Sequence, residues 1–232
     1  MESSIAQRLT QIRTRMEAAC ARCGRDPQSV ELIGVSKTKP AATIDAVAQE
    51  GQLLFGESYV QEFCDKYAAV SAKVRWHFIG ALQSNKVKYL GGKVEMIHAL
   101  DRFSLAREIN KQWGKLDATI DVLLQVNLAG EQSKSGVAPD KVEALVKRIA
   151  ELPHVRIQGL MTLPPFMQDP EDVRPWFRQL RELAHKIETL NIPRVSMHTL
   201  SMGMSHDFEV AIEEGATLVR VGTAIFGARE AR

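Results

Sequence analysis

The chain has 232 residues, of which 45% are hydrophobic and 25% are charged, the balance of an ordinary globular protein. Its 30 Lys and Arg against 28 Asp and Glu give a formal net charge of +2, which argues against a dedicated nucleic-acid binder. No apolar run approaches the roughly 20 residues that span a bilayer, and three cysteines argue against a disulfide framework, so we expect a cytoplasmic protein that binds neither nucleic acid nor membrane.

Residues 1–29 are predicted to form a helix and a lead-in. The apolar residues of this segment recur at steps of three and four and so share one helix face: Ile5, Leu9, Ile12, Met16, Ala19 and Cys23. Gly24 is expected to end this helix because glycine readily adopts the conformation that follows a helix C-terminus.

Eight short segments rich in apolar residues are predicted to be strands. They cover residues 30–36, 52–57, 75–80, 95–100, 119–127, 155–161, 195–202 and 217–222. Several are nearly continuous apolar runs, which is typical of strands buried on both faces of a parallel sheet. The sequence therefore favours parallel strands covered by helices.

Helical patterns fill most of the intervals between these strands. They run from Pro40 to Gly51, from Asp101 to Gly114, over 142–149, over 173–190 and from Ser205 to Gly215, with Asp101 and Ser205 as expected N-caps. Strands that alternate with helices over this length predict a (β/α)₈ TIM barrel, and residues 30–232 would form it. We expect one domain over 1–232, with an extra N-terminal helix. The alternative is an open doubly wound sheet, although no GxGxxG motif follows the first strand.

The ends of the predicted strands place a lysine where chemistry would occur. Active sites of such barrels lie at the C-terminal ends of the strands, and Lys37 directly follows the first strand. Partial desolvation there would lower the pKa of its amine and make it a nucleophile toward carbonyls. The alternative is a surface lysine paired with a carboxylate.

Small residues follow the last two predicted strands. Ser201 and Gly203 lead into one helix, and Gly222 and Thr223 lead into another. In barrels these two loops frequently bind phosphate through backbone N–H groups at a helix N-terminus. Ordinary turns are the alternative, but the paired location favours a phosphate site.

A strand-end lysine and a phosphate site together fit pyridoxal 5′-phosphate (PLP), which carries both an aldehyde and a phosphate. A Schiff-base aldolase acting on a sugar phosphate would use the same two features. Arg220 favours PLP, because a guanidinium facing the pyridine nitrogen would donate a hydrogen bond and leave that nitrogen unprotonated. A salt bridge within the barrel is the alternative role for Arg220.

The chain resembles the pyridoxal phosphate homeostasis protein family over essentially its whole length. The matching segments are GVSKTKP (34–40), GESYVQE (56–62), WHFIGALQSNK (76–86), QVNLAGEQSKSG (125–136), GLMTLPP (159–165), LSMGMSHDFEVAI (200–212) and VRVGTAIFG (219–227). The resemblance implies a fold-type-III barrel like the N-terminal domain of alanine racemase. It also implies that Lys37 forms a Schiff base with PLP, that Ser201, Gly222 and Thr223 hold its phosphate, and that Arg220 faces its pyridine nitrogen.

Two positions depart from the pattern of that family. Ser58 stands where the family usually has Asn, and Ala81 stands where a larger residue is usual. The first departure leaves any polar contact of that Asn in doubt. The histidines show no metal-ligand spacing, and we expect no metal site.

Two kinds of function fit this site. The first is a PLP-binding protein that buffers the cofactor and delivers it to PLP-dependent apo-enzymes, its expected partners. Such a protein would have no catalytic residues of its own. The alternative is a PLP-dependent racemase or a related enzyme of fold type III. Such enzymes carry a C-terminal β-domain after the barrel, and no such domain is expected before Arg232. We therefore favour the binding protein, and expect a monomer.

Overall fold

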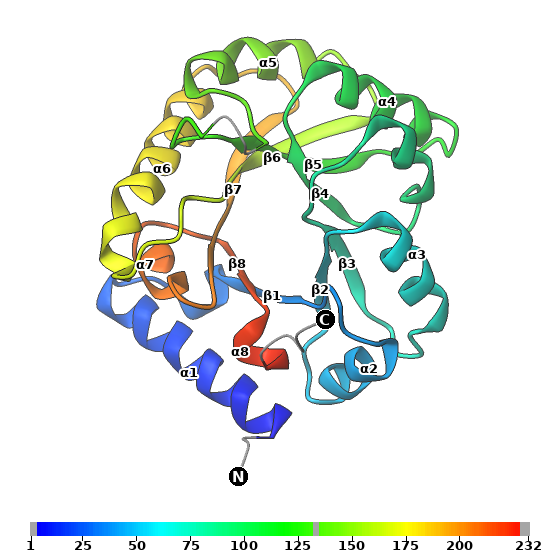
Figure 1. Ribbon diagram of the computed structural model, residues 1–232. Coiled ribbons are helices and arrows are strands. Elements are labelled where there is room, and N and C mark those ends of the chain that lie inside the picture. Colours follow the sequence, from blue (N-terminus) through cyan, green and yellow to red (C-terminus); the bar gives the residue numbers. More distant parts are fainter. Residues whose placement is uncertain (1–3, 132–134, 228–232) are drawn as a thin grey trace.

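Eight parallel strands close into a barrel, which confirms the TIM-barrel prediction (Figure 1). The structure, a computed structural model, describes residues 4–131 and 135–227. The strands are β1 (Glu31–Val35), β2 (Leu54–Glu57), β3 (Arg75–Phe78), β4 (Met96–Leu100), β5 (Ile120–Val126), β6 (Val155–Thr162), β7 (Val195–Met204) and β8 (Leu218–Val221). Each pairs with its neighbours in chain order, and β8 pairs with β1, so the open doubly wound alternative is wrong.

Helices surround the ring of strands (Figure 1). The α-helices are α1 (Ile5–Arg22), α2 (Ala41–Gln49), α3 (Val60–Ala69), α4 (Phe103–Gly114), α5 (Val142–Ile149), α6 (Arg174–Glu188), α7 (Phe208–Glu213) and α8 (Thr223–Phe226). Short 3₁₀ turns are η1 (Pro27–Ser29), η2 (Ser84–Tyr89), η3 (Pro139–Lys141) and η4 (Pro170–Val173). The extra helix α1 begins at a capping box between Ser4 and Gln7 and packs outside the barrel against α7 and α8.

The two predicted N-caps are wrong. Arg102 occupies the N-cap of α4. The Asp101 carboxylate does not cap the helix but accepts a hydrogen bond from the Arg102 guanidinium. Asp207 occupies the cap of α7. The Ser205 hydroxyl does not cap α7 because it lies next to backbone N–H groups after β8.

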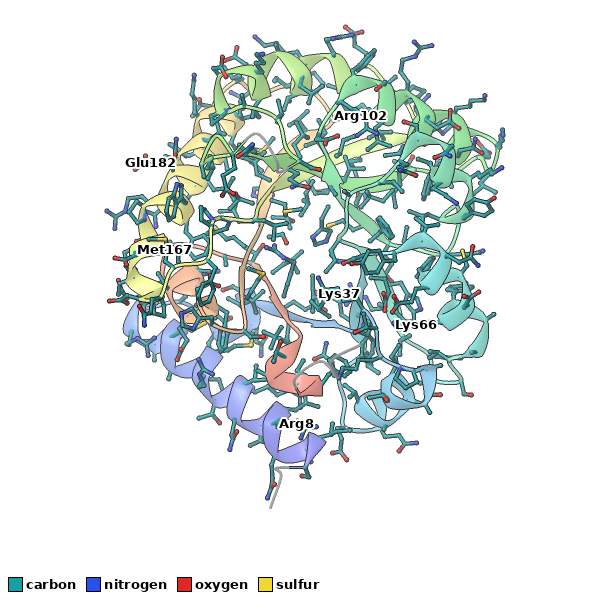
Figure 2. The ribbon with its side chains drawn as sticks, viewed as in Figure 1. Arg8, Lys37, Lys66, Arg102, Met167 and Glu182 are labelled. Atoms are coloured by element: carbon teal, nitrogen blue, oxygen red, sulfur yellow. The ribbon has the colours of Figure 1, made fainter. Side chains whose placement is uncertain are left out.

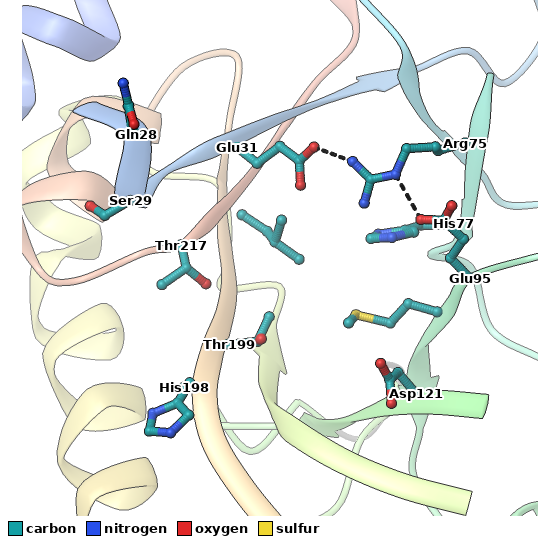
Figure 3. A pocket seen from close by; sticks show the side chains of 12 residues that line it. Gln28, Ser29, Glu31, Arg75, His77, Glu95, Asp121, His198, Thr199 and Thr217 are labelled. Atoms are coloured by element: carbon teal, nitrogen blue, oxygen red, sulfur yellow. Dashed lines mark hydrogen bonds and ion pairs between the residues drawn. The ribbon is translucent and has the colours of Figure 1, made fainter. Parts of the chain in front are cut away.

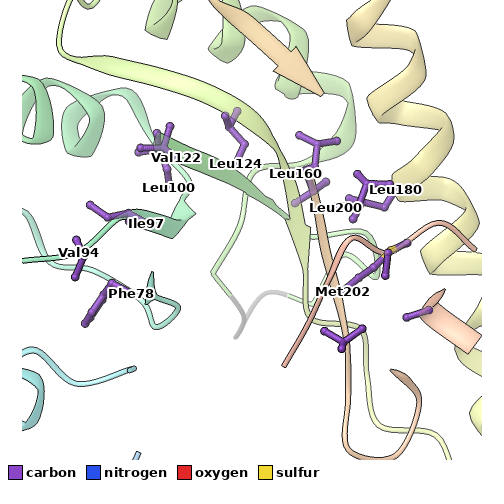
Figure 4. Close-up of a cluster of buried hydrophobic side chains, with 14 of the residues drawn as sticks. Phe78, Val94, Ile97, Leu100, Val122, Leu124, Leu160, Leu180, Leu200 and Met202 are labelled. Carbon is purple, nitrogen blue, oxygen red and sulfur yellow. The ribbon is translucent and has the colours of Figure 1, made fainter. Parts of the chain in front are cut away.

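The apolar core has two layers separated by the strands. Outward-facing strand residues pack against the helices, and Figure 4 shows part of this layer, including Ile97, Val122 and Leu160. A smaller cluster fills the barrel interior: Ile33, Leu54, Ala99, Leu123, Met161 and Leu218. Successive side chains of a strand point to opposite faces, so Arg220 on β8 lies on the interior side together with Leu218. The interior therefore has an apolar part and, further along β8, a polar part.

Candidate functional site

Lys37 lies in the turn that directly follows β1, at the C-terminal mouth of the barrel. Its side chain is partly buried, and Figure 2 shows it inside the ring of strands with Lys66 farther out. The next residue, Thr38, has a φ of +67°, a conformation that costs a non-glycine residue of order 1–3 kcal/mol. Such strain persists only where neighbouring groups hold the backbone in place, so we expect firm contacts around this turn.

A buried ion-pair cluster holds the Lys37 turn. The Lys66 ammonium on α3 donates to the Ser36 carbonyl at 2.6 Å and to the Glu57 carboxylate at 2.6 Å. It also lies 2.5 Å from the Glu62 carboxylate, which accepts the backbone N–H of Thr38. The Ser36 hydroxyl donates to Glu57 at 2.7 Å. Backbone groups on both sides of Lys37 are therefore fixed by side chains of β2 and α3.

Glu57 is the most deeply buried member of this cluster, with a fully buried side chain. Burial raises the pKa of its carboxyl, and the hydrogen bonds from Lys66 and Ser36 oppose that rise. One of its oxygens, Oε2, has no hydrogen-bond partner among the described residues. This cluster was not predicted, because Glu57 and Lys66 lie on different elements and no local pattern pairs them.

The turn after β8 adjoins the Lys37 turn. Gly34 of β1 is in register with Val221 of β8, so Lys37 and Gly222 follow the ends of neighbouring strands. A Cβ at Gly222 would lie 3.2 Å from the carbonyl oxygen of Val35, a close approach that favours glycine. The two sequence-predicted turns, one with the lysine and one with the glycine, are thus brought together.

Two backbone N–H groups converge on one hydroxyl at this turn. The N–H groups of Gly222 and Ala224 lie 3.3 and 3.5 Å from Ser205 Oγ, and Thr223 between them is exposed. A cluster of backbone donors next to a hydroxyl is the donor set that binds a phosphate. The sequence pattern suggested a helix cap for Ser205, so its position at this turn was not predicted.

Gly203 allows the chain to reach this position from β7. Its φ is +89°, and a Cβ there would lie 2.6 Å from Ala211 Cβ and 2.9 Å from Phe208 Cα. Only glycine adopts this backbone without a clash. The close packing of the end of β7 on α7 thereby sets the position of Ser205.

Arg220 is buried in the barrel interior beside this turn. Its guanidinium donates to Ser201 Oγ at 2.6 Å and to the Thr162 carbonyl at 2.9 Å. Burial lowers its pKa to about 10, opposed by the charge of Asp207. These two hydrogen bonds engage Nη1 and Nη2, so the plane of the guanidinium is fixed inside the barrel.

Ser201 is fully buried and contacts Arg220 and His98. Its predicted contact with a phosphate stays a prediction, and the geometry favours Ser205 for that contact. His77 and His98 were not predicted as site residues. His98 Nδ1 lies 3.0 Å from Ser201 Oγ, and His98 Nε2 lies 3.0 Å from His77 Nδ1.

A cavity of about 430 Å³ opens at the opposite, N-terminal mouth (Figure 3). Arg75 spans it with ion pairs to Glu31 at 2.6 Å and to Glu95 at 2.8 Å. His77 lines it, but neither Lys37 nor Gly222 does. The cavity is therefore separate from the mouth that holds the lysine and the phosphate-type donors.

The remaining predicted features have simple structural settings. Ala81 is exposed, and Ser58 is partly buried beside Gly80, where a Cβ would lie 2.3 Å from the Ser58 carbonyl oxygen. No three metal-binding side chains cluster in the described part of the chain. Within the same part, every helix is too short or too polar to cross a bilayer.

Comparison with known proteins adds three findings. The family model described as the alanine racemase N-terminal domain matches residues 7–230. Proteins called pyridoxal phosphate homeostasis protein are 50% identical over 225 residues in Aquifex aeolicus (97% of this chain, 98% of that protein) and 41% identical over 232 residues in Escherichia coli K12 (98% of each). The solved structure of PipY from Synechococcus elongatus with PLP bound covers 97% of this chain and 100% of its own, with a TM-score of 0.85 and 35% identity.

Proposed function

The chain belongs to the pyridoxal phosphate homeostasis proteins, within the alanine racemase N-terminal domain family, and from this premise we propose that it binds PLP and buffers and delivers the cofactor in the cell. The observation that carries the proposal is the meeting of three groups at one mouth of the barrel. These are the Lys37 turn, the paired N–H groups of Gly222 and Ala224, and the buried guanidinium of Arg220.

The donor set fits the chemistry of PLP. The N–H groups of Gly222 and Ala224, with the hydroxyls of Ser205 and Thr223, would hold the phosphate. Arg220 would face the pyridine nitrogen, with its guanidinium held in place by Ser201 and Thr162. Lys37 would be the covalent attachment point, and bound PLP would supply an electrophilic carbon there.

The buried cluster beneath Lys37 has a role in this scheme. Because Lys66 and Glu62 fix the backbone on either side of Lys37, the amine is offered from a rigid turn. The Lys66 amine is engaged by two carboxylates and a carbonyl in this buried cluster, so it points away from the ligand site at the mouth.

A titration followed by absorbance tests this proposal. PLP should bind with a new band in the near-ultraviolet or visible region, and pyridoxal, which lacks the phosphate, should bind much more weakly. Each charge-assisted hydrogen bond lost should cost about 1.5–3 kcal/mol. Ser205→Ala should reduce the preference for PLP over pyridoxal, with Ser196→Ala, a partly buried serine near the start of β7, as the control. Equal affinity for the two compounds would refute the phosphate site.

We also propose that the protein has no substantial amino-acid racemase or decarboxylase activity. The relatives' name supports this, and Arg220 supports it weakly, because an unprotonated ring stabilises a carbanion poorly. The test is solvent-deuterium exchange at Cα across a panel of L-amino acids. Robust exchange with one substrate, lost in Lys37→Ala, would instead support the racemase-like alternative.

The partners of the protein follow from a carrier role. We propose that PLP-dependent apo-enzymes receive the cofactor from this protein. We also propose that the protein is a monomer with a single barrel domain.

The cytoplasm is the proposed location. The cysteines support a reducing compartment, because Cys20, Cys23 and Cys64 are all free thiols. Activation of an apo-enzyme in the presence of a trap for free PLP tests direct delivery, and sedimentation equilibrium tests the monomer.

A further inference from the structure

A chain of polar side chains runs through the interior of the barrel. His77 on β3, His98 on β4, Ser201 on β7 and Arg220 on β8 are all buried, with exposed fractions of 4% or less. Consecutive members lie within hydrogen-bond distance: 3.0 Å between the histidines, 3.0 Å from His98 to Ser201, and 2.6 Å from Ser201 to Arg220. Each comes from a different strand, so no local pattern requires the contact.

The chemistry of the groups fixes the direction of this chain. A guanidinium only donates, so the Ser201 oxygen accepts from Arg220. The Ser201 hydroxyl then has its own proton to donate, and His98 Nδ1 is the acceptor that the described residues offer. A neutral His98 that accepts at Nδ1 carries its proton on Nε2 and donates it to His77 Nδ1.

The electrostatics agree with neutral imidazoles. Burial lowers the pKa of His98 well below its usual value, and the neighbouring His77 and Arg220 lower it further. Burial lowers the pKa of His77 to about 3, aided by Arg75 and opposed by Asp121. His77, the last of these hydrogen-bonded side chains, lines the cavity at the N-terminal mouth (Figure 3).

We propose that His98 is a positioning residue for the cofactor: by accepting the Ser201 proton it directs the Ser201 oxygen to Arg220 and so fixes the guanidinium that faces the pyridine nitrogen. This rests on the proposed function, because the position of Arg220 matters only to a ligand in the barrel mouth. His98 itself is fully buried. It acts through Ser201, and His77 holds the far side of its ring.

Two substitutions separate the positioning role from simple filling of space. In His98→Asn the amide oxygen can take the place of Nδ1 and keep the contact with Ser201. In His98→Gln the amide reaches the place of Nε2, keeping His77 and losing Ser201. We expect PLP affinity to fall by less than about threefold in the Asn variant and by roughly tenfold in the Gln variant, the factor that one lost hydrogen bond of about 1.4 kcal/mol produces.

The spectrum of bound PLP gives a second readout. The Gln variant should shift the absorbance band and its pH dependence, while the Asn variant should keep the wild-type band. If Gln, the closer match in size, is the milder change, His98 only fills space and the positioning role is wrong. If wild type binds no PLP, the proposed function itself fails and the positioning role falls with it.

A measurement on the wild type without cofactor needs no variant to fold. ¹⁵N NMR of the imidazoles should show His98 neutral at pH 7 with its proton on Nε2. A proton on Nδ1, or a charged ring, would overturn the assigned direction and the proposal, whether or not PLP binds.

Discussion

Replacing Lys66 by methionine should strongly destabilise the fold, because it leaves Glu57 as an unpaired charge in the core. The two groups are 2.6 Å apart, with side chains 7% and 0% exposed. Removing one partner of a buried pair costs about 3–5 kcal/mol, whereas exposed pairs contribute about 1 kcal/mol or less. For a domain of this size, a loss of about 3–5 kcal/mol corresponds to a decrease of roughly 6–20 °C in Tm.

The loss should depend on pH in a defined direction. Burial raises the pKa of Glu57 in the folded protein, so the folded state binds this proton more tightly than the unfolded state does. Such a carboxyl destabilises the fold as pH rises from its unfolded pKa through its folded pKa. Without Lys66 the folded pKa rises further, so the penalty of Lys66→Met should be largest near pH 8 and should shrink toward about pH 5.

Urea denaturation of four proteins tests this reasoning: wild type, Lys66→Met, Glu57→Gln/Lys66→Met and Lys147→Met. The double variant should recover most of the stability because it removes the buried charge. Lys147→Met is the matched control, since Lys147 pairs with Glu143 at 2.7 Å on the surface of α5, where solvent screens the pair and its loss should change stability little. A penalty for Lys66→Met under about 1 kcal/mol, or one independent of pH, would refute the argument.

Two further predictions concern the backbone and the buried histidines. Gly203→Ala should cost about 2–5 kcal/mol of stability, because Gly203 has a φ of +89° and an added Cβ would clash with Ala211. Gly24→Ala, at a φ of +67° with nothing within 4 Å of the added Cβ, should cost about 1–2 kcal/mol. Equal changes in the urea midpoint of the two variants would contradict the close approach at Gly203. The pKa values of His77 and His98 are depressed in the folded protein, so the unfolded state binds protons more tightly at these two sites. The free energy of unfolding should therefore be unaffected by them above about pH 6.5 and should fall below that pH, by about 1.4 kcal/mol per pH unit for each histidine. His77→Gln should remove about half of this dependence between pH 7.5 and 5.5, and an unchanged dependence would show that His77 is not the group responsible.

The fold was predictable because its signal is local. All eight strands lie at the predicted segments, since apolar runs and helical stripes are set by burial within each element. Lys37 and Gly222 were also predictable as neighbours, because strand order alone brings the ends of β1 and β8 together.

The contacts inside the barrel were harder to predict. A signal for His77 existed: it lies between the outward-facing Trp76 and Phe78, so alternation points it inward. The contact between His98 and Ser201 could not be inferred, because the stagger between β4 and β7 depends on register shifts in the intervening strand pairs. Ser205 was assigned to the wrong helix for a related reason, since its partners lie 17 and 19 residues away in the next turn.

The most direct test of a PLP site at this mouth is to locate the covalent attachment. Wild type and Lys37→Ala would each be loaded with PLP, reduced with borohydride, digested and mapped by mass spectrometry. The label should lie on Lys37 in wild type and be absent from the corresponding peptide of the variant, with Lys39, two residues away, as the internal control. A label confined to other lysines, or none in wild type, would contradict the assignment of this mouth of the barrel as the PLP site.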